Sequence, residues 1–261
     1  PICIPYPPIG IDDVRPARPS PWDTATAGYY YINAGTGTDT SNPYGTPGTP
    51  KKTIPNPIPV GSYVEVHGTY NLGSGGITSI NGQGTGDTWV ANTSGPVWVV
   101  GENAGAKPVF TLKTVVYGTY VFMDLVDIAT KGLQVGSGAA GFDADNIVIR
   151  NCDSAGDGVT KTSGIYVIGA SGYEVTNVVL YNNTIHDHGD VLLSTDQDAI
   201  GIGSDYYVSN LWILENTVDT TSGPGIRVGG AFPSPGSDFT HHLYVGKNTV
   251  FNVRQAGIGV K

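Results

Sequence analysis

Charged residues are scarce in this chain of 261 residues, and basic residues are the scarcer kind. Only 13% of the residues are charged, and 13 Lys and Arg stand against 22 Asp and Glu, which gives a formal net charge of −9 at pH 7. Nucleic acids and anionic membranes are bound through clusters of basic side chains that neutralise phosphate groups. The sequence shows no such cluster, so we expect neither of them as a partner.

Cysteines and long apolar runs are also lacking. The two cysteines, Cys3 and Cys152, are too few for a disulfide framework. We expect two independent thiols, although the sequence leaves a pairing open. No run of 18 apolar residues occurs, so we expect no membrane span. The length fits one large all-β domain.

Proline is plentiful only at the start of the chain. The first 21 residues hold seven of the 18 prolines. Proline lacks a backbone donor and fixes φ, so this segment can be neither a helix nor a central strand. We therefore separate a proline-rich N-terminal arm, residues 1–28, from a domain at residues 29–261. The arm is expected to lie on the body or on a neighbouring molecule, or else to be a flexible leader.

The second half of the chain contains a repeat. Four similar segments have spacings of 31, 33 and 32 residues and begin at Asn146, Asn177, Asn210 and His242. Each alternates in the manner of a strand and ends in a polar turn, whose shared position is occupied by Cys152, Asn183, Asn216 and Asn248. An asparagine at such a turn tolerates a left-handed backbone and bonds the equivalent amide in the next repeat.

A second strand follows the first in every repeat, after a loop of variable length. Its copies begin at Gly164, Ala199, Gly225 and Gly257, and a weaker copy of the whole unit begins at Tyr120 and continues at Gly132. Strands that recur with this period, without helical periodicity between them, indicate a solenoid of stacked parallel strands. Successive repeats then share one apolar core.

This pattern resembles the right-handed parallel β-helix of the pectate-lyase-like superfamily. The resemblance covers residues 29–261 and includes "PVGSYVEVHGTYN" from Pro59, which resembles the first-rung motif, and "GPVWVVGENAGAKPVF" from Gly95, which resembles the following rung. It implies an extracellular or cell-surface location. Known roles in this superfamily include polysaccharide lyases, glycoside hydrolases, epimerases, adhesins and phage tailspikes. The catalytic motifs of polygalacturonases are absent, and one fold hosts many functions.

The second strands predict a column of outward-facing side chains. Alternation directs Ile165, Ile200, Ile226 and Ile258 inward, and the residues after them outward: Tyr166, Gly201, Arg227 and Gly259. Arg227 would then stand in a shallow groove with Tyr166 two repeats away. A guanidinium and an aromatic ring suit an acidic sugar. The alternative is a solvent-facing arginine that balances Asp198 or Asp219.

The loop from His186 to Asp198 is the longest beside this column and the richest in ionisable groups. Alternate residues of a strand face the same side, so His186 and His188 can meet one metal ion, and several aspartates offer the oxygen ligands that calcium prefers. We therefore predict metal ligands at Asp196, Asp198, Asp190 and His186, with calcium as the one cofactor suggested. The same residues also fit acid–base catalysis or a solvated loop.

Two functions follow as hypotheses. The first is a secreted or surface protein that binds and cleaves polysaccharide as a lyase or glycoside hydrolase, with catalytic residues Asp198, Arg227 and His188 and substrate-binding residues Tyr166, Arg227 and Tyr206. The second is a non-catalytic structural or adhesive protein of an extracellular filament, spike or virion. The chain stops at "QAGIGVK" without a capping segment, so we expect either a longer native chain or self-assembly through this open end.

Overall fold

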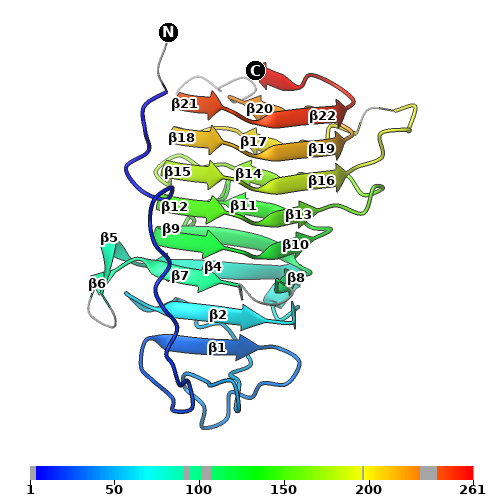
Figure 1. Ribbon diagram of the computed structural model, residues 1–261. Coiled ribbons are helices and arrows are strands. Elements are labelled where there is room, and N and C mark those ends of the chain that lie inside the picture. The colour runs from blue at the N-terminus through cyan, green and yellow to red at the C-terminus, as the bar shows by residue number, and fades with distance from the viewer. Residues whose placement is uncertain (1–3, 91–93, 102–106, 196, 230–239, 261) are drawn as a thin grey trace.

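The computed structural model describes residues 4–90, 94–101, 107–195, 197–229 and 240–260. It is an all-β stack in which the chain climbs from β1 at one end to β21, β22 and β23 at the other (Figure 1). Nearly every strand pairs in parallel with the equivalent strand of the next coil. The prediction of an all-β fold built from parallel strands is therefore confirmed, and the stack is solenoid-like.

The strands form three columns. The first contains β1 (Tyr29–Asn33), β2 (Tyr63–His67), β7 (Val97–Val100), the end of β9 (Lys113–Asp124), β12 (Ala144–Arg150), β15 (Val175–Tyr181), β18 (Val208–Leu214) and β21 (His241–Gly246). The second contains β3 (Thr69–Tyr70), β8 (Val109–Phe110), β10 (Asp127–Ala129), β13 (Asp153–Ala155), β16 (Thr184–His188), β19 (Thr217–Thr221) and β22 (Thr249–Val253).

The third column contains β4 (Ile77–Gln83), the start of β9, β11 (Leu133–Val135), β14 (Ile165–Val167), β17 (Ile202–Ser204), β20 (Ile226–Val228) and β23 (Ile258–Val260). Because β9 serves two columns, the first and third join into one sheet of 14 strands, and the second is a sheet of seven. The remaining elements are the 3₁₀ turn η1 (Ser74–Gly76) and the antiparallel pair β5 (Thr85–Val90) and β6 (Ser94–Gly95).

The repeat read from the sequence sets the register of the first column. Ile147 pairs with Val178, Val178 with Leu211, and Leu211 with Leu243, one coil after another. Ile147, Val178 and Leu211 are fully buried in the apolar interior of the stack. The strands predicted from Asn146, Asn177, Asn210 and His242 are thus confirmed.

The predicted register of the third column is wrong at one coil. Ile165 pairs with Ile202 rather than Ile200, so the outward neighbour of Tyr166 is Gly203 and not Gly201. Ile202 pairs in turn with Ile226, and Arg227 pairs with Gly259. In the segment "AIGIG", Ile200 and Ile202 are two residues apart and face the same side of the strand. The loop before it is long enough to bring either isoleucine opposite Ile165.

A column of buried amides joins the polar turns. Asn183 N–H donates to Asn216 Oδ1 at 3.0 Å, and Asn216 N–H donates to Asn248 Oδ1 at 2.9 Å. Cys152, a free buried thiol, begins the column by donating its N–H to Asn183 Oδ1 at 3.0 Å. The predicted contact between equivalent amides is confirmed. The left-handed backbone lies one residue earlier, for example at Asn182 with φ 51°.

A second apolar cluster lies on the outer face of the first column and is covered by the N-terminal segment. In Figure 1 this blue segment runs across the coils. Ile9 and Trp22 pack in this cluster, and Trp212 Nε1 donates to Pro5 O at 2.9 Å. Alternation with Leu211 and Ile213 turns Trp212 away from the interior, to the side of a strand where a side chain is ordinarily exposed. Trp212 is instead 6% exposed, since the segment covers it.

Buried polar groups tie the same segment to the coils. Arg150 donates from Nη1 to Gly10 O at 2.9 Å and Asp13 O at 2.8 Å, and its Nη2 lies 3.1 Å from Asp124 Oδ2. Arg15 donates to Gly101 O at 2.7 Å. The contacts therefore run both ways: Arg150 of the coils reaches carbonyls of the segment, and Arg15 of the segment reaches a carbonyl of the coils. Cys3 lies outside the described residues.

The amide column is expected to carry much of the stability of the stack. Asn216→Ala removes a fully buried amide that also donates to Leu180 O at 2.9 Å, and it takes away the Oδ1 that accepts from the backbone N–H and from Nδ2 of Asn183. We expect a loss of about 3 kcal/mol in the free energy of unfolding, measured by urea denaturation. The control Asn182→Gly, at an exposed left-handed turn, should lose less than about 1 kcal/mol. Equal losses in both variants would contradict a structural role for the column.

Candidate functional site

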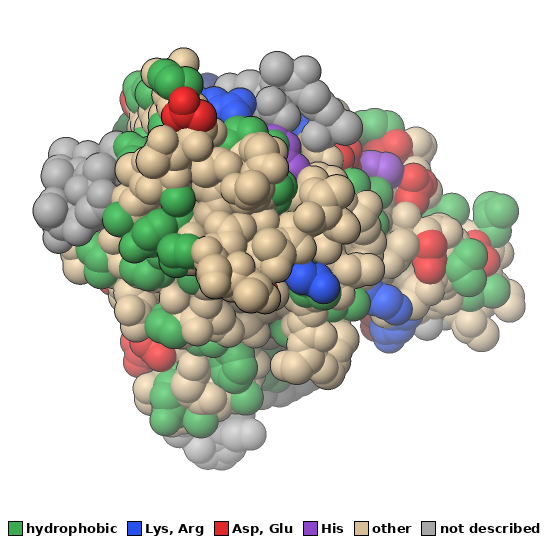
Figure 2. Space-filling view, turned by 90° about the horizontal axis from the view of Figure 1, so that it is seen from below, with side chains coloured by type: hydrophobic (Ala, Val, Ile, Leu, Met, Phe, Trp, Pro, Cys, Tyr) green, Lys and Arg blue, Asp and Glu red, His purple; other side chains and the backbone are tan. Residues whose placement is uncertain are grey.

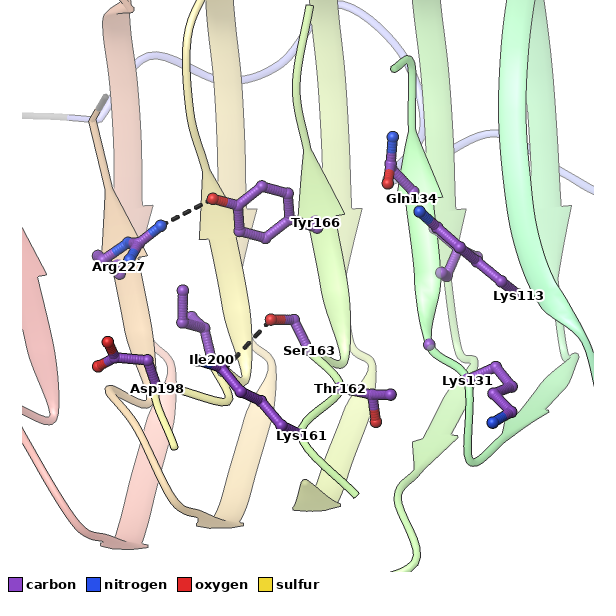
Figure 3. Close-up of a pocket in the computed structure, with 12 residues that line it drawn as sticks. Lys113, Lys131, Gln134, Lys161, Thr162, Ser163, Tyr166, Asp198, Ile200 and Arg227 are labelled. Atoms are coloured by element: carbon purple, nitrogen blue, oxygen red, sulfur yellow. Dashed lines mark hydrogen bonds between the residues drawn. The ribbon is translucent and has the colours of Figure 1, made fainter. Parts of the chain in front are cut away.

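A groove of about 500 Å³ runs along the outward face of the third column (Figure 3). Strands β9, β11, β14 and β20 supply its lining together with the loops that lead into β11, β14 and β17. These residues are Lys113, Lys131, Gly132, Leu133, Gln134, Lys161, Thr162, Ser163, Tyr166, Asp198, Ile200 and Arg227. The groove therefore crosses successive coils at right angles to the strands, as stacked parallel strands permit.

Tyr166, Asp205 and Arg227 form a polar triad at one end of the groove. Arg227 Nη2 donates to Tyr166 Oη at 2.7 Å, and Tyr166 donates to Asp205 Oδ2, also at 2.7 Å. Arg227 Nη2 lies 3.9 Å from the same carboxylate oxygen. The predicted neighbourhood of Tyr166 and Arg227, two coils apart, is thus present, with a direct hydrogen bond between them.

Gly203 makes this contact possible. A Cβ atom at Gly203 would lie 2.5 Å from Tyr166 Cε2, so the tyrosine ring lies against the glycine backbone on its way to Arg227. Burial and the hydrogen bond to Asp205 raise the pKa of the Tyr166 hydroxyl above its ordinary value, so it stays protonated at neutral pH and donates to the carboxylate. The triad fixes the position of the guanidinium.

Basic side chains dominate the charge of the groove. Lys113, Lys131, Lys161 and Arg227 line it together with one carboxylate, Asp198. Asp198 Oδ1 accepts a hydrogen bond from Gln255 Nε2 at 2.8 Å. In the part of the chain that the structure describes, Lys113, Lys131 and Lys161 have no ion pair within 4.0 Å. The groove is therefore a cationic surface on an acidic protein.

The sequence did not single out Lys113, Lys131 or Asp205 as site residues. Lys131 and Lys161 both come shortly before a strand of the third column, in equivalent loops, so an alignment of these loops could have found the pair. Lys113 joins them because β9 begins beside β4 and β11, a pairing that no local pattern indicates.

The two histidines of the predicted metal site point to different places. We expected His186 and His188 to face the same side of a strand. This prediction is wrong, because Asp187 has φ 58° and breaks the alternation between them. His186 is partly exposed, with Nε2 at 3.1 Å from Asp153 Oδ1 and Nδ1 at 2.7 Å from Asp187 Oδ2. Burial opposes protonation of His186, but Asp187 and Asp153 raise its pKa above the ordinary value.

His188 is fully buried and holds the inner side of the groove wall. Its Nδ1 lies 3.1 Å from Thr162 O, and its Nε2 lies 3.0 Å from Ser154 O. Burial lowers the pKa of this imidazole below its ordinary value. His188 thus positions Thr162, which lines the groove, and does not itself line it. This placement does not suit the predicted catalytic role.

The remaining predicted ligands are dispersed. Asp190 Oδ1 accepts from Leu192 N–H at 2.8 Å, Asp198 lines the groove, and Asp196 lies outside the described residues. Among the described residues, no three His, Cys, Asp or Glu side chains gather in a way that could hold a metal ion. Tyr206 does not line the groove, and its carbonyl accepts a hydrogen bond from Gly169 N–H at 2.9 Å. The calcium site stays a prediction without a structural cluster to support it.

The buried imidazole of His188 should make the folded protein less stable as the pH falls. The folded-state pKa of His188 is lowered, so below the unfolded value of about 6.5 the unfolded chain binds a proton that the folded chain does not. This contribution is therefore present above pH 6.5 and is lost as pH falls. Between pH 7.5 and 5.5, His188→Gln should therefore lose less unfolding free energy than the unaltered protein. Equal pH slopes in urea denaturation would contradict a neutral buried His188.

No helix of the described residues is both long and apolar enough to cross a membrane. Comparison of the chain with protein-family models, with curated proteins and with solved structures gives no significant match.

Proposed function

We propose that this protein binds an acidic polysaccharide along the groove of the third column. The observation that carries the proposal is the gathering of four of the 13 basic residues in one groove of a chain with net charge −9. A cleft lined by charges of one sign concentrates ligands of the opposite sign. Arg227, held in place by Tyr166 and Asp205, offers the planar donor that suits a sugar carboxylate.

The spacing of the coils supports a polymeric ligand. Lys113, Lys131, Lys161 and Arg227 belong to different coils, and neighbouring strands of a sheet lie about 4.8 Å apart. A linear chain of uronic acids carries one carboxylate on every sugar ring, a repeat of similar length. Such a chain, laid across the strands, can meet one cation after another.

We also propose that the stack is a right-handed parallel β-helix of the pectate-lyase-like superfamily and that the protein works outside the cell or at its surface. The parallel register and the buried amide column support the assignment of the fold. The location rests on the resemblance and on a polysaccharide ligand.

The charges of the groove give the first test of this function. Lys131→Gln and Lys161→Gln should each weaken binding of polygalacturonate or alginate roughly two- to fivefold, because each variant loses one exposed ion pair. Binding by the unaltered protein should weaken as salt is added. The measurement is affinity electrophoresis or calorimetry with each polysaccharide.

Lys247→Gln is the matched control, since Lys247 is exposed and pairs with Glu215 at 3.0 Å away from the groove. It should bind both polysaccharides like the unaltered protein. If the two groove variants bind as the control does, the ligand lies elsewhere.

A second proposal is that the groove also cleaves the bound chain. Asp198 lies beside Arg227 among the groove residues (Figure 3). In a lyase reaction, Arg227 would hold the uronate carboxylate while Asp198 takes the proton from the adjacent carbon. The glycosidic C–O bond then breaks, its electron pair leaves with the departing sugar oxygen, which takes a proton from water, and an unsaturated product remains. In hydrolysis the same aspartate would act on water, and the product would have an ordinary reducing end.

Cleavage is tested by the products and by Asp198→Asn. We expect unsaturated or reducing ends from an acidic polysaccharide, a rate at least a hundredfold lower in Asp198→Asn, and an affinity within about twofold of the unaltered protein. Full cleavage activity in both Asp198→Asn and Arg227→Ala would rule out this reaction centre.

A further inference from the structure

A second hollow lies where β4 forms the edge of the third column. β4 pairs with β9 on one side, and in the described part of the chain only the bridge from Ile58 to Gly82 joins its other side. The loop of residues 53–56, the end of β3 and the start of β4 enclose a cleft of about 290 Å³. Ile77 of this cleft pairs with Lys113 of the groove, so the two hollows are neighbours on one sheet.

The lining of this cleft is neutral. It combines hydroxyl and amide groups, among them Thr78, Ser79 and Asn56, with the apolar surfaces of Leu72 and Ile77, and none of the described acidic or basic side chains lines it. Seen from the β1 end, the surface of the molecule is likewise mostly neutral (Figure 2). The cleft therefore differs in chemistry from the cationic groove beside it.

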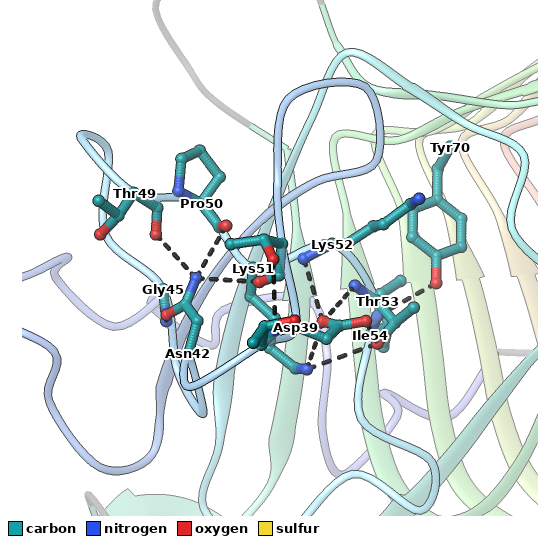
Figure 4. Close-up of polar contacts among 12 residues, drawn as sticks. Asp39, Asn42, Gly45, Thr49, Pro50, Lys51, Lys52, Thr53, Ile54 and Tyr70 are labelled. Atoms are coloured by element: carbon teal, nitrogen blue, oxygen red, sulfur yellow. Dashed lines mark hydrogen bonds and ion pairs between the residues drawn. The ribbon is translucent and has the colours of Figure 1, made fainter.

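The nearby charge is compensated inside the loop that forms the wall. Asp39 accepts hydrogen bonds from Lys51 Nζ at 2.6 Å, from Thr53 N–H at 3.2 Å and from Thr53 Oγ1 at 2.8 Å (Figure 4). These contacts hold residues 51–54 in place and outweigh burial, so the pKa of Asp39 lies below its ordinary value. These contacts thus fix the loop that forms the wall, and the charges of Asp39 and Lys51 neutralise each other outside the cleft.

Two hydroxyl groups at the cleft have unused hydrogen-bonding capacity. Thr78 is 3% exposed, and its Oγ1 is buried without a hydrogen-bond partner among the described residues. Tyr70 Oη accepts from Ile54 N–H at 3.1 Å, and no described group accepts its own hydrogen. A buried hydroxyl without a partner is unfavourable, and a ligand that pairs with it recovers part of that free energy. Thr114, the partner of Thr78 on β9, is equally buried but donates to Leu112 O at 3.3 Å.

We propose that this cleft binds one neutral monosaccharide unit. A pyranose presents hydroxyl groups that both donate and accept, which suits Thr78 and Tyr70, and C–H faces that pack on Leu72 and Ile77. The volume suits a single ring and not a chain. The proposal rests on this cleft alone and does not depend on the function of the groove.

The test uses neutral methyl glycosides of glucose, galactose, mannose and rhamnose as probes on the full chain. At least one should shift the backbone amide NMR signals of residues 70–79 at millimolar concentration. Thr78→Val should weaken its binding roughly three- to tenfold and leave the melting temperature unchanged or higher, since the lost hydroxyl has no partner in the folded protein. The control Thr114→Val should keep the affinity and melt at a lower temperature.

Three results would each overturn the proposal. They are the absence of amide shifts with all four glycosides, unchanged affinity in Thr78→Val, and a fall in melting temperature in Thr78→Val as large as in Thr114→Val. The last result would mean that the Thr78 hydroxyl stabilises the folded protein and is not free for a ligand. None of them bears on uronate binding, which the lysine variants of the groove measure separately.

Discussion

The stacking of one coil directly on the next is the constraint on which the rest of this molecule depends. Parallel ladders fix the height of each coil, and the amides of Asn183, Asn216 and Asn248, of which the first two are buried, fix the place where each coil turns. Polar groups in an apolar interior are tolerated only when they are paired, so each amide requires the next one in line. This requirement aligns side chains that are about 32 residues apart in sequence, and the groove is a consequence of that alignment.

The sequence predicted the parts of the fold that repeat. Each coil must place apolar residues inward and an asparagine at the turn, so the first column could be aligned correctly from Asn146 to His242. The third column could be aligned only to within two residues. A shift of one residue reverses the faces of a strand, but a shift of two preserves them. Ile200 and Ile202 are therefore equivalent to any argument from alternation, and only the path of the preceding loop distinguishes them.

The other errors have two sources, a contact that does not repeat and a backbone conformation that strand alternation does not reveal. Trp212 does point away from the interior, but a segment more than 200 residues earlier in the chain covers it, and the hydrogen bond to Pro5 O has no local signal. His186 and His188 are separated by one left-handed residue, Asp187, and the residues in register with it, Thr220 and Asn252, are left-handed too. Alternation holds only while the backbone stays extended, and a solenoid must bend several times in each turn.

The residues of the candidate site divide in the same way, into those that lie on the repeating strands and those that other parts of the chain bring in. Tyr166 and Arg227 could be identified because they belong to the repeating strands. Lys131 could have been found only by aligning the loops before those strands, and Lys113 could not be found, because the long shared strand β9 brings it in. Net charge was also a poor guide to this surface. A value of −9 describes the whole molecule, yet electrostatic attraction acts over about a Debye length, roughly 8–10 Å at physiological salt. Within that distance the basic residues of the groove outnumber Asp198, and the ligand responds to this local charge. The stack therefore creates, by aligning side chains from separate coils, a cationic surface that neither the composition nor any single segment of the chain contains.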